Sequence, residues 1–129
     1  MTLSNPFDFT GKIALVTGGT RGIGKELTLT LAQHGARVFF CGTNAELGNQ
    51  VAESINSALP QGGSPTKFYQ VDVSDFKACN DMIGSIVKEA GQVDFLINNA
   101  GITRDNLLMR LKESDWDDVM AVNLKGCFN

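Results

Sequence analysis

The chain has 129 residues, of which 43% are hydrophobic and 19% are charged, and its formal net charge is -3 at pH 7. This length fits one domain, and the composition excludes a disordered or fibrous protein, while the slight acidity excludes a general basic field for nucleic acid or anionic membrane. The widely spaced Cys41, Cys79 and Cys127 include no Cys-x-x-Cys motif, so neither a disulfide framework nor a zinc site is expected.

The first residues, MTLSNPFDFTGK, contain neither an apolar signal core nor a basic leader. Further along the chain, no apolar run is long enough to cross a bilayer. We therefore expect a cytoplasmic protein that binds neither membrane nor nucleic acid.

Residues 12–17, KIALVT, form a continuous apolar run that is typical of a strand buried on both faces of a parallel sheet. The second, third and fourth strands are expected at residues 36–41, 67–73 and 93–98. Each is followed by a segment with apolar residues at helical spacing. This order, without a domain linker, predicts an α/β fold with a Rossmann-like doubly wound parallel sheet in α/β/α layers. Only the first four strands and their helices are expected, in a single domain of residues 1–129.

Capping signals mark the ends of the predicted helices. The first helix is expected to end at His34-Gly35, where the histidine serves as a cap or surface residue. The second is expected to begin with Thr43 of a Thr-x-x-Glu capping box, the third with Ser74 and the fourth with Ser114. Trp116 has core spacing on the fourth helix and is expected to be buried.

The stretch TGGTRGIGK, residues 17–25, lies between the first strand and the first helix, where backbone amides can bind a phosphate. It nearly matches the nucleotide-triphosphatase pattern G-x-x-x-x-G-K-[ST], but Glu26 replaces the hydroxyl residue that binds magnesium. A glycine-rich connector without a ligand is a second alternative. The third is a dinucleotide turn, in which Thr17, Gly18, Gly22 and Gly24 are spaced as T-G-x-x-x-G-x-G.

Small or polar residues also follow the other predicted strands. Because doubly wound sheets bind ligands at the carboxyl ends of their strands, this convergence favours the dinucleotide turn. The residues concerned are Gly42-Thr43-Asn44, Asp72-Val73 and Asn98-Asn99-Ala100-Gly101.

The end of the second strand favours NADP over NAD. A carboxylate at this place usually binds the ribose hydroxyls of NAD, and it would repel the 2′-phosphate of NADP. Here the strand ends CGTN, without an acid. Arginine binds phosphate through charge-assisted hydrogen bonds, so we expect NADP(H), with Arg21 and Thr43 near the 2′-phosphate. Arg37, at the far end of its strand, is expected to form a surface pair instead.

Two of these features have structural alternatives. Asp72 could accept a hydrogen bond from the adenine amino group while Val73 lies against the ring, or it could cap the next helix beside Ser74. The small residues of 98–101 would admit a ribose, but an Asn-rich turn of purely structural purpose would look alike.

Four segments resemble, in content and order, the motifs of the short-chain dehydrogenase/reductase family. They are the glycine turn, Asp72-Val73, Asn98–Gly101 and Asn123 in VNLKG. The stretch NNAGITRDNLLMRL, 98–111, is similar to that of 3-oxoacyl-[acyl-carrier-protein] reductases. The resemblance implies NADPH-dependent reduction of a 3-oxoacyl thioester on acyl carrier protein in fatty acid biosynthesis, by a homotetramer without a metal. The implied cofactor contacts are Thr17, Gly18, Thr20, Arg21, Gly22, Ile23, Gly24, Thr43, Asp72, Val73, Asn99, Ala100 and Gly101.

By the same resemblance, Asn123 is the first member of an Asn-Ser-Tyr-Lys catalytic set, although a buried amide at a helix bend would look alike. The sequence departs from the family here, because Tyr69 is the only tyrosine and Val73, not a lysine, stands four residues later. We therefore expect the cofactor-binding half of a longer enzyme, truncated before its Ser, Tyr and Lys and inactive alone. Its fourth strand would be an apolar edge prone to aggregation.

Two other functions remain open from the sequence. One is another short-chain carbonyl reductase, acting on quinones, sugars or steroids. The other is a non-catalytic NADP-binding module. Arg104 and Arg110 could meet the acidic carrier protein, but surface arginines commonly have no such role.

Overall fold

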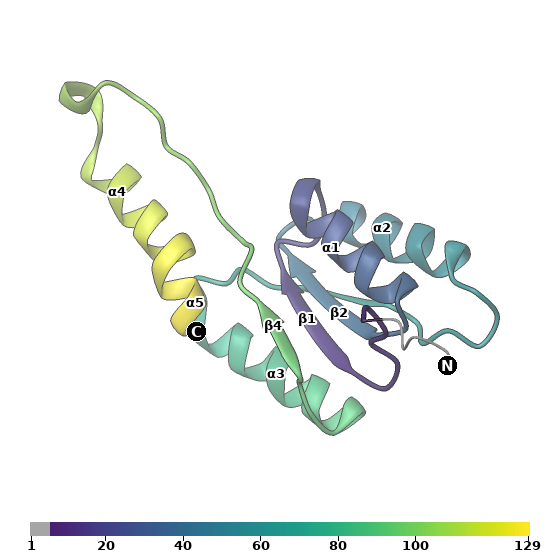
Figure 1. Cartoon of the computed structure of the whole chain (residues 1–129). Coiled ribbons are helices and arrows are strands. Elements are labelled where there is room, and N and C mark those ends of the chain that lie inside the picture. Colours follow the sequence, from purple (N-terminus) through teal and green to yellow (C-terminus); the bar gives the residue numbers. More distant parts are fainter. Residues whose placement is uncertain (1–5) are drawn as a thin grey trace.

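A computed structural model describes residues 6–129 (Figure 1). Within this range the chain forms one sheet of four parallel strands, in the order β3-β2-β1-β4. This confirms the predicted Rossmann-like α/β fold. The strands are β1 Ile13–Thr17, β2 Arg37–Gly42, β3 Lys67–Gln70 and β4 Phe95–Ile97.

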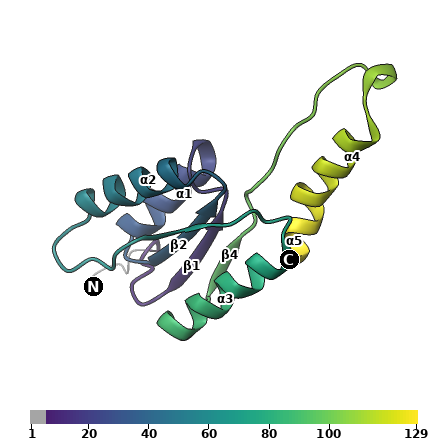
Figure 2. The ribbon, with the colours of Figure 1, turned by 180° about the vertical axis from the view of Figure 1, so that it is seen from behind.

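Helices cover both faces of the sheet, as the two opposite views show (Figures 1 and 2). Helices α1 (Gly22–Gln33) and α2 (Ala45–Ala58) pack on one face, and α3 (Phe76–Ala90) packs on the other. In β1, Leu15 belongs to the α3 side of the core and Val16 to the α1 and α2 side. Because side chains alternate along a strand, an apolar residue is needed at every position of this central strand.

The two outer strands are shorter than predicted. We expected the third strand to reach Val73, but it ends at Gln70, and Val71 and Val73 are buried in the loop that follows. The fourth strand covers only Phe95–Ile97 of the predicted 93–98. It lies at an edge of the sheet, with Phe95 38% and Leu96 50% exposed.

Two predicted helix starts are one residue early. Asn44, not Thr43, caps α2, because its side-chain oxygen accepts a 2.9 Å hydrogen bond from the Leu47 N–H. Asp75, not Ser74, caps α3 in the same way. In both cases the residue that caps the helix directly follows the one that we chose. The end of α1 is confirmed, since His34 is its carboxyl-terminal cap and Gly35 has a φ of 94°.

The fourth helix also differs from its prediction. Helix α4 (Glu113–Met120) begins one residue before Ser114, and the Lys112 N–H donates to Asp115. Trp116 is 68% exposed, so its predicted burial is wrong. The spacing of apolar residues identified a helix, but it could not show whether another element covers that face.

A helical rod ends the chain and projects away from the sheet (Figures 1 and 2). It consists of α4, a π-helix at Ala121–Lys125 and α5 (Gly126–Phe128). An extended segment with a 3-10 turn at Leu108–Arg110 connects β4 to the rod. Among residues 6–129, no helix combines the length and hydropathy that a membrane span requires.

Candidate cofactor-binding site

A cavity of about 860 Å³ lies at the carboxyl ends of the strands. Its wall is formed by the glycine turn, the end of β2, the loop after β3, the segment after β4, and the start of the π-helix. Twelve of the thirteen cofactor contacts expected from the sequence line it: Gly18, Thr20, Arg21, Gly22, Ile23, Gly24, Thr43, Asp72, Val73, Asn99, Ala100 and Gly101. Thr17, the thirteenth, is buried behind the wall.

The glycine turn has a backbone that other residues would strain. Gly18 and Gly22 have φ values of 65° and 53°, in the left-handed region. A Cβ atom at Gly24 would lie 2.1 Å from the Gly18 carbonyl oxygen, so a larger residue would push the turn and α1 apart. Because no side chain caps α1, its first amides are available to an anion at the cavity wall.

Thr17 and Asn99 connect this turn to the segment after β4. The Thr17 hydroxyl oxygen accepts hydrogen bonds of 3.0 Å from the backbone N–H groups of both Asn99 and Ala100. In return, the Asn99 side-chain amide donates to the carbonyls of Thr17 at 3.0 Å and Gly18 at 3.1 Å. Thr17 therefore shapes the cavity without lining it.

Arg21 and Thr43 line the same cavity and are exposed. Within the described part of the chain, Arg21 takes part in no ion pair. The end of β2 carries no acid. Gly42 packs closely on Thr20, since a Cβ atom at Gly42 would lie 2.7 Å from the threonine methyl group. This corner therefore offers a guanidinium and a hydroxyl to a ligand.

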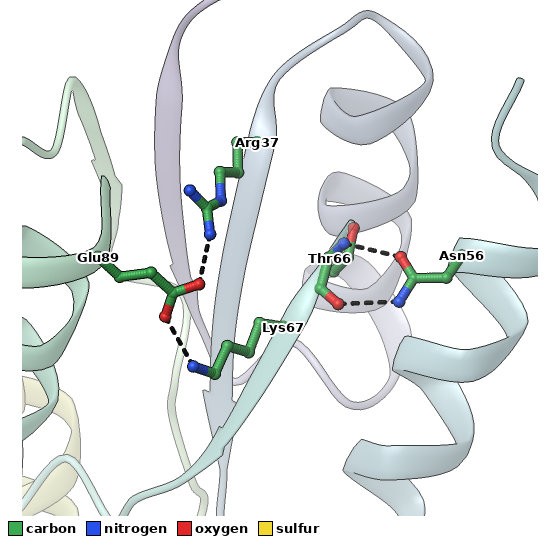
Figure 3. A network of polar contacts seen from close by, with 5 residues as sticks. All are labelled: Arg37, Asn56, Thr66, Lys67 and Glu89. Carbon is green, nitrogen blue, oxygen red and sulfur yellow. Dashed lines mark hydrogen bonds and ion pairs between the residues drawn. The ribbon is translucent and has the colours of Figure 1, made fainter. Parts of the chain in front are cut away.

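Arg37 forms the surface pair that its position predicted (Figure 3). Glu89 of α3 accepts from Arg37 of β2 and, at 2.7 Å, from Lys67 of β3. Its hydrogen bond with Lys67 lowers the pKa of Glu89 and raises that of Lys67. Arg37 and Lys67 are the first residues of their strands, so this network lies at the end of the sheet opposite the cavity.

Asp72 uses one carboxylate oxygen locally, accepting from the Ser74 backbone N–H at 2.9 Å and from its hydroxyl at 2.7 Å. It therefore shapes the turn before α3 and also lines the cavity, but it does not cap the helix as the structural alternative predicted, because Asp75 is the cap. Val73 is only 6% exposed, and its carbonyl accepts a 2.8 Å hydrogen bond from the Asn129 side chain.

Asn123 lies in the π-helix and binds the backbone of Ile102. Its side-chain oxygen accepts from the Ile102 N–H at 2.8 Å, and its amide donates to the Ile102 carbonyl at 3.0 Å. Ala121 and Val122 of the same segment line the cavity, whereas Asn123 does not. The oxygen and the nitrogen of the Asn123 amide thus connect the rod to Ile102 in the cavity wall. The catalytic role of Asn123 stays a prediction.

Two polar residues near the cavity, Asp118 and Gln70, were missed from the sequence, and the role of a third, Arg104, stayed open. Arg104 and Asp118 both line the cavity, and their side chains form a 3.4 Å ion pair between the segment after β4 and α4. Gln70, at the end of β3, donates a 3.2 Å hydrogen bond to the Thr43 carbonyl. These contacts join residues that are 14 and 27 positions apart in sequence, so no local signal could have revealed them.

Two other groups lie away from the cavity. Tyr69 packs on the α3 side of the sheet, with the Lys67 ammonium 5.2 Å from the centre of its ring. Burial raises the pKa of the Cys41 thiol to about 11, so this cysteine is not a nucleophile at neutral pH. Across the described residues, no three His, Cys, Asp or Glu side chains gather as metal ligands.

The chain matches the short chain dehydrogenase family over residues 12–129. It is 45% identical over 118 residues to the 3-oxoacyl-[acyl-carrier-protein] reductase FabG of Staphylococcus aureus (strain Mu50), covering 92% of this chain and 47% of that protein. The protein of the same name from Escherichia coli (strain K12) is 45% identical over 121 residues, 94% of this chain and 47% of the relative.

A solved structure supports the same relationship. It is described as a putative short-chain alcohol dehydrogenase from Sinorhizobium meliloti 1021, and it superposes with a TM-score of 0.86 and 32% sequence identity, over 96% of this chain and 48% of that one. The chain therefore spans about half the length of the relatives that it matches. The match over residues 12–129, with this fold and motif set, shows that the chain belongs to the short-chain dehydrogenase/reductase family of oxidoreductases, which generally bind a nicotinamide cofactor.

Proposed function

We propose that the chain binds NADP(H) and provides the cofactor-binding half of a 3-oxoacyl-[acyl-carrier-protein] reductase. The reaction is the reduction of the 3-oxo group to a 3-hydroxy group in fatty acid biosynthesis. The observation that carries the choice of cofactor is Arg21, a cavity-lining guanidinium without an ion pair in the described residues, beside a β2 end that has no acid. The relatives' names support the choice of reaction.

The cavity wall suits the parts of such a cofactor. The uncapped first amides of α1 would hold the pyrophosphate, and Gly22, where a Cβ atom would meet nothing within 4 Å, leaves the backbone room to approach it. Gly24 instead lets α1 pack closely on Gly18. Arg21 and Thr43 would bind the 2′-phosphate. Asp72 and Val73 would border the adenine, and Asn99 to Gly101 the ribose near the reacting ring. When bound, the cofactor supplies the hydride.

The proton for the new hydroxyl must come from another group. In the family pattern it comes from a tyrosine with a neighbouring lysine, and a phenol with an ordinary pKa near 10 needs such a cation at neutral pH. The 129-residue sequence contains no Tyr-x-x-x-Lys. We therefore propose that this chain alone binds the cofactor without reducing the substrate, and that Asn123 acts only together with those residues.

The same proposal includes acyl carrier protein as the partner, a homotetramer as the assembly and the cytoplasm as the location. The rod exposes a row of apolar side chains that a subunit contact would cover: Trp116, Met120, Leu124 and Phe128. Arg104 and Arg110 lie on the exposed segment before the rod and would favour an acidic carrier.

Titration of the chain with NADPH and NADH, followed by the fluorescence of the bound reduced nicotinamide, tests the proposed cofactor. We expect tighter binding of NADPH and a loss of that preference in Arg21→Ala. Equal affinities in the wild type would contradict NADP selectivity. The loss of NADPH absorbance in the presence of an acetoacetyl thioester of the carrier protein then tests for reduction of the substrate. We expect no loss with this chain alone, and turnover would contradict our account of the proton donor.

A further inference from the structure

The corner between β2 and α2 forms the part of the cavity wall that contains Thr43. Gly42, Thr43 and Asn44 line the cavity in succession. Within residues 6–129, neither the backbone N–H nor the hydroxyl of Thr43 has a hydrogen-bond partner. Thr43 therefore has two groups free for a ligand, but only if the backbone of this corner is held in place.

The neighbouring residues hold the backbone from both sides. The Gly42 carbonyl accepts from the Val71 N–H at 3.0 Å, and this is the last backbone hydrogen bond between the two chain segments. The Asn44 side chain caps α2. Between them, among the hydrogen bonds of residues 6–129, the Thr43 carbonyl accepts only from the Gln70 side-chain amide, at 3.2 Å.

Gln70 is suited to this contact by its place in the sheet. It is the last residue of β3 and pairs with Gly42 in the parallel register. Two residues earlier, Phe68 packs under α2, where a Cβ atom at Gly48 would lie 2.3 Å from its ring. Because side chains alternate along a strand, Gln70 lies on the same face, next to the start of α2. Its amide thus replaces the strand hydrogen bond that is absent beyond Gly42.

We propose that Gln70 is a positioning residue for cofactor selectivity. By holding the Thr43 carbonyl, it keeps the Thr43 N–H and hydroxyl at the cavity wall, where they meet the 2′-phosphate together with Arg21. This inference rests on the proposed NADP(H) binding. Gln70 itself does not line the cavity, so its effect passes through Thr43.

The affinities of Gln70→Ala for NADPH and NADH test the inference. We expect about three- to tenfold weaker NADPH binding, the usual effect of one neutral hydrogen bond, and less than about twofold for NADH. Gln70→Glu keeps the length of the side chain but cannot donate to a carbonyl, so it should lose at least as much. Gln50→Ala is the matched control, because Gln50 is an exposed glutamine of α2 whose side chain, within residues 6–129, hydrogen-bonds only to Glu46. Equal weakening for both cofactors, or no change, would overturn the proposal.

A second measurement does not need the cofactor. The NMR order parameter of the Thr43 amide reports fast motion of this corner, and we expect it to fall in Gln70→Ala but not in Gln50→Ala. An unchanged order parameter would also overturn the role of Gln70. A wild type that binds both cofactors equally would instead contradict the proposed NADP preference, and the order parameter would then decide the positioning role separately.

Discussion

The sheet and the carboxyl-terminal rod are both predicted from local sequence patterns, but they bury their apolar residues very differently. Every residue of β1 is buried, with helices on both sides. In α4, no residue of the helix is buried. The comparison teaches that a local pattern was enough to predict a strand in one region and a helix in the other. Whether their side chains are buried depended on neighbours from elsewhere in the chain.

The rod is joined to the sheet by a few specific contacts. They include the Asn123 pair with Ile102, the Asn129 bond to Val73, the close packing of Gly126 on Val73, the stacking of Phe76 on Phe128 with ring centres 6.3 Å apart, and the exposed Arg104–Asp118 pair. Stability should therefore reside in the sheet, and changes in the rod should have small effects on unfolding.

A pair of leucine substitutions tests this difference most strongly. Leu15→Ala, at a fully buried site of β1, should lower the free energy of unfolding by about 2–5 kcal/mol because it leaves a cavity between packed layers. Leu124→Ala, on the rod where the side chain is 62% exposed, should change it by less than about 0.5 kcal/mol. Urea denaturation measures both, and similar losses would show that the rod is packed in solution.

A glycine pair sharpens the comparison within the sheet region. Gly24→Ala should destabilise the protein by about 1–3 kcal/mol and abolish cofactor binding, because the new methyl group meets the Gly18 carbonyl. Gly84→Ala is the control, since Gly84 lies in α3 with no atom within 4 Å of a new Cβ, and it should stabilise the helix by about 0.5–1 kcal/mol. Thermal unfolding and NADPH titration report the two effects, and a Gly24→Ala protein that binds normally would contradict the turn geometry.

The connection between the glycine turn and the segment after β4 should have a similar effect on stability. Thr17→Val removes the oxygen that accepts from the Asn99 and Ala100 N–H groups, so we expect a loss of about 1–3 kcal/mol. Thr30→Val, at an exposed site of α1, should have little effect. Chemical denaturation of both variants checks the difference, and equal stabilities would show that these bonds contribute nothing net.

A pH effect at β1 should be the smallest. The Ile13 N–H donates to Asp94 at 2.8 Å and holds the pKa of that carboxyl below its ordinary value of 3.8. A lowered folded-state pKa stabilises the protein above the unfolded value, and this contribution is lost as the pH falls from 3.8 through the folded-state pKa. The stability of Asp94→Asn should therefore depend less on pH in this window. Denaturation at several pH values tests this, and parallel curves for both proteins would refute it.

The parts that the sequence predicted correctly are those with local causes. The apolar run of β1 and the glycines of the turn each reflect a requirement that a few neighbouring residues impose. Thr43 and Asn44 are adjacent and both have side chains that can cap a helix, and capping preferences do not resolve a difference of one residue. The exposure of Trp116 and the contact of Gln70 with Thr43 depend on which segments meet in space, and no local pattern records that.

The Thr17–Asn99 connection also affects the order of folding. Its hydrogen bonds join residues 82 positions apart, and such distant contacts form only after the intervening chain has been closed into a loop. During synthesis, β1 and the glycine turn leave the ribosome long before Asn99 does. The phosphate-binding turn therefore reaches its final shape late, and an unfinished chain exposes it without the residues that close it.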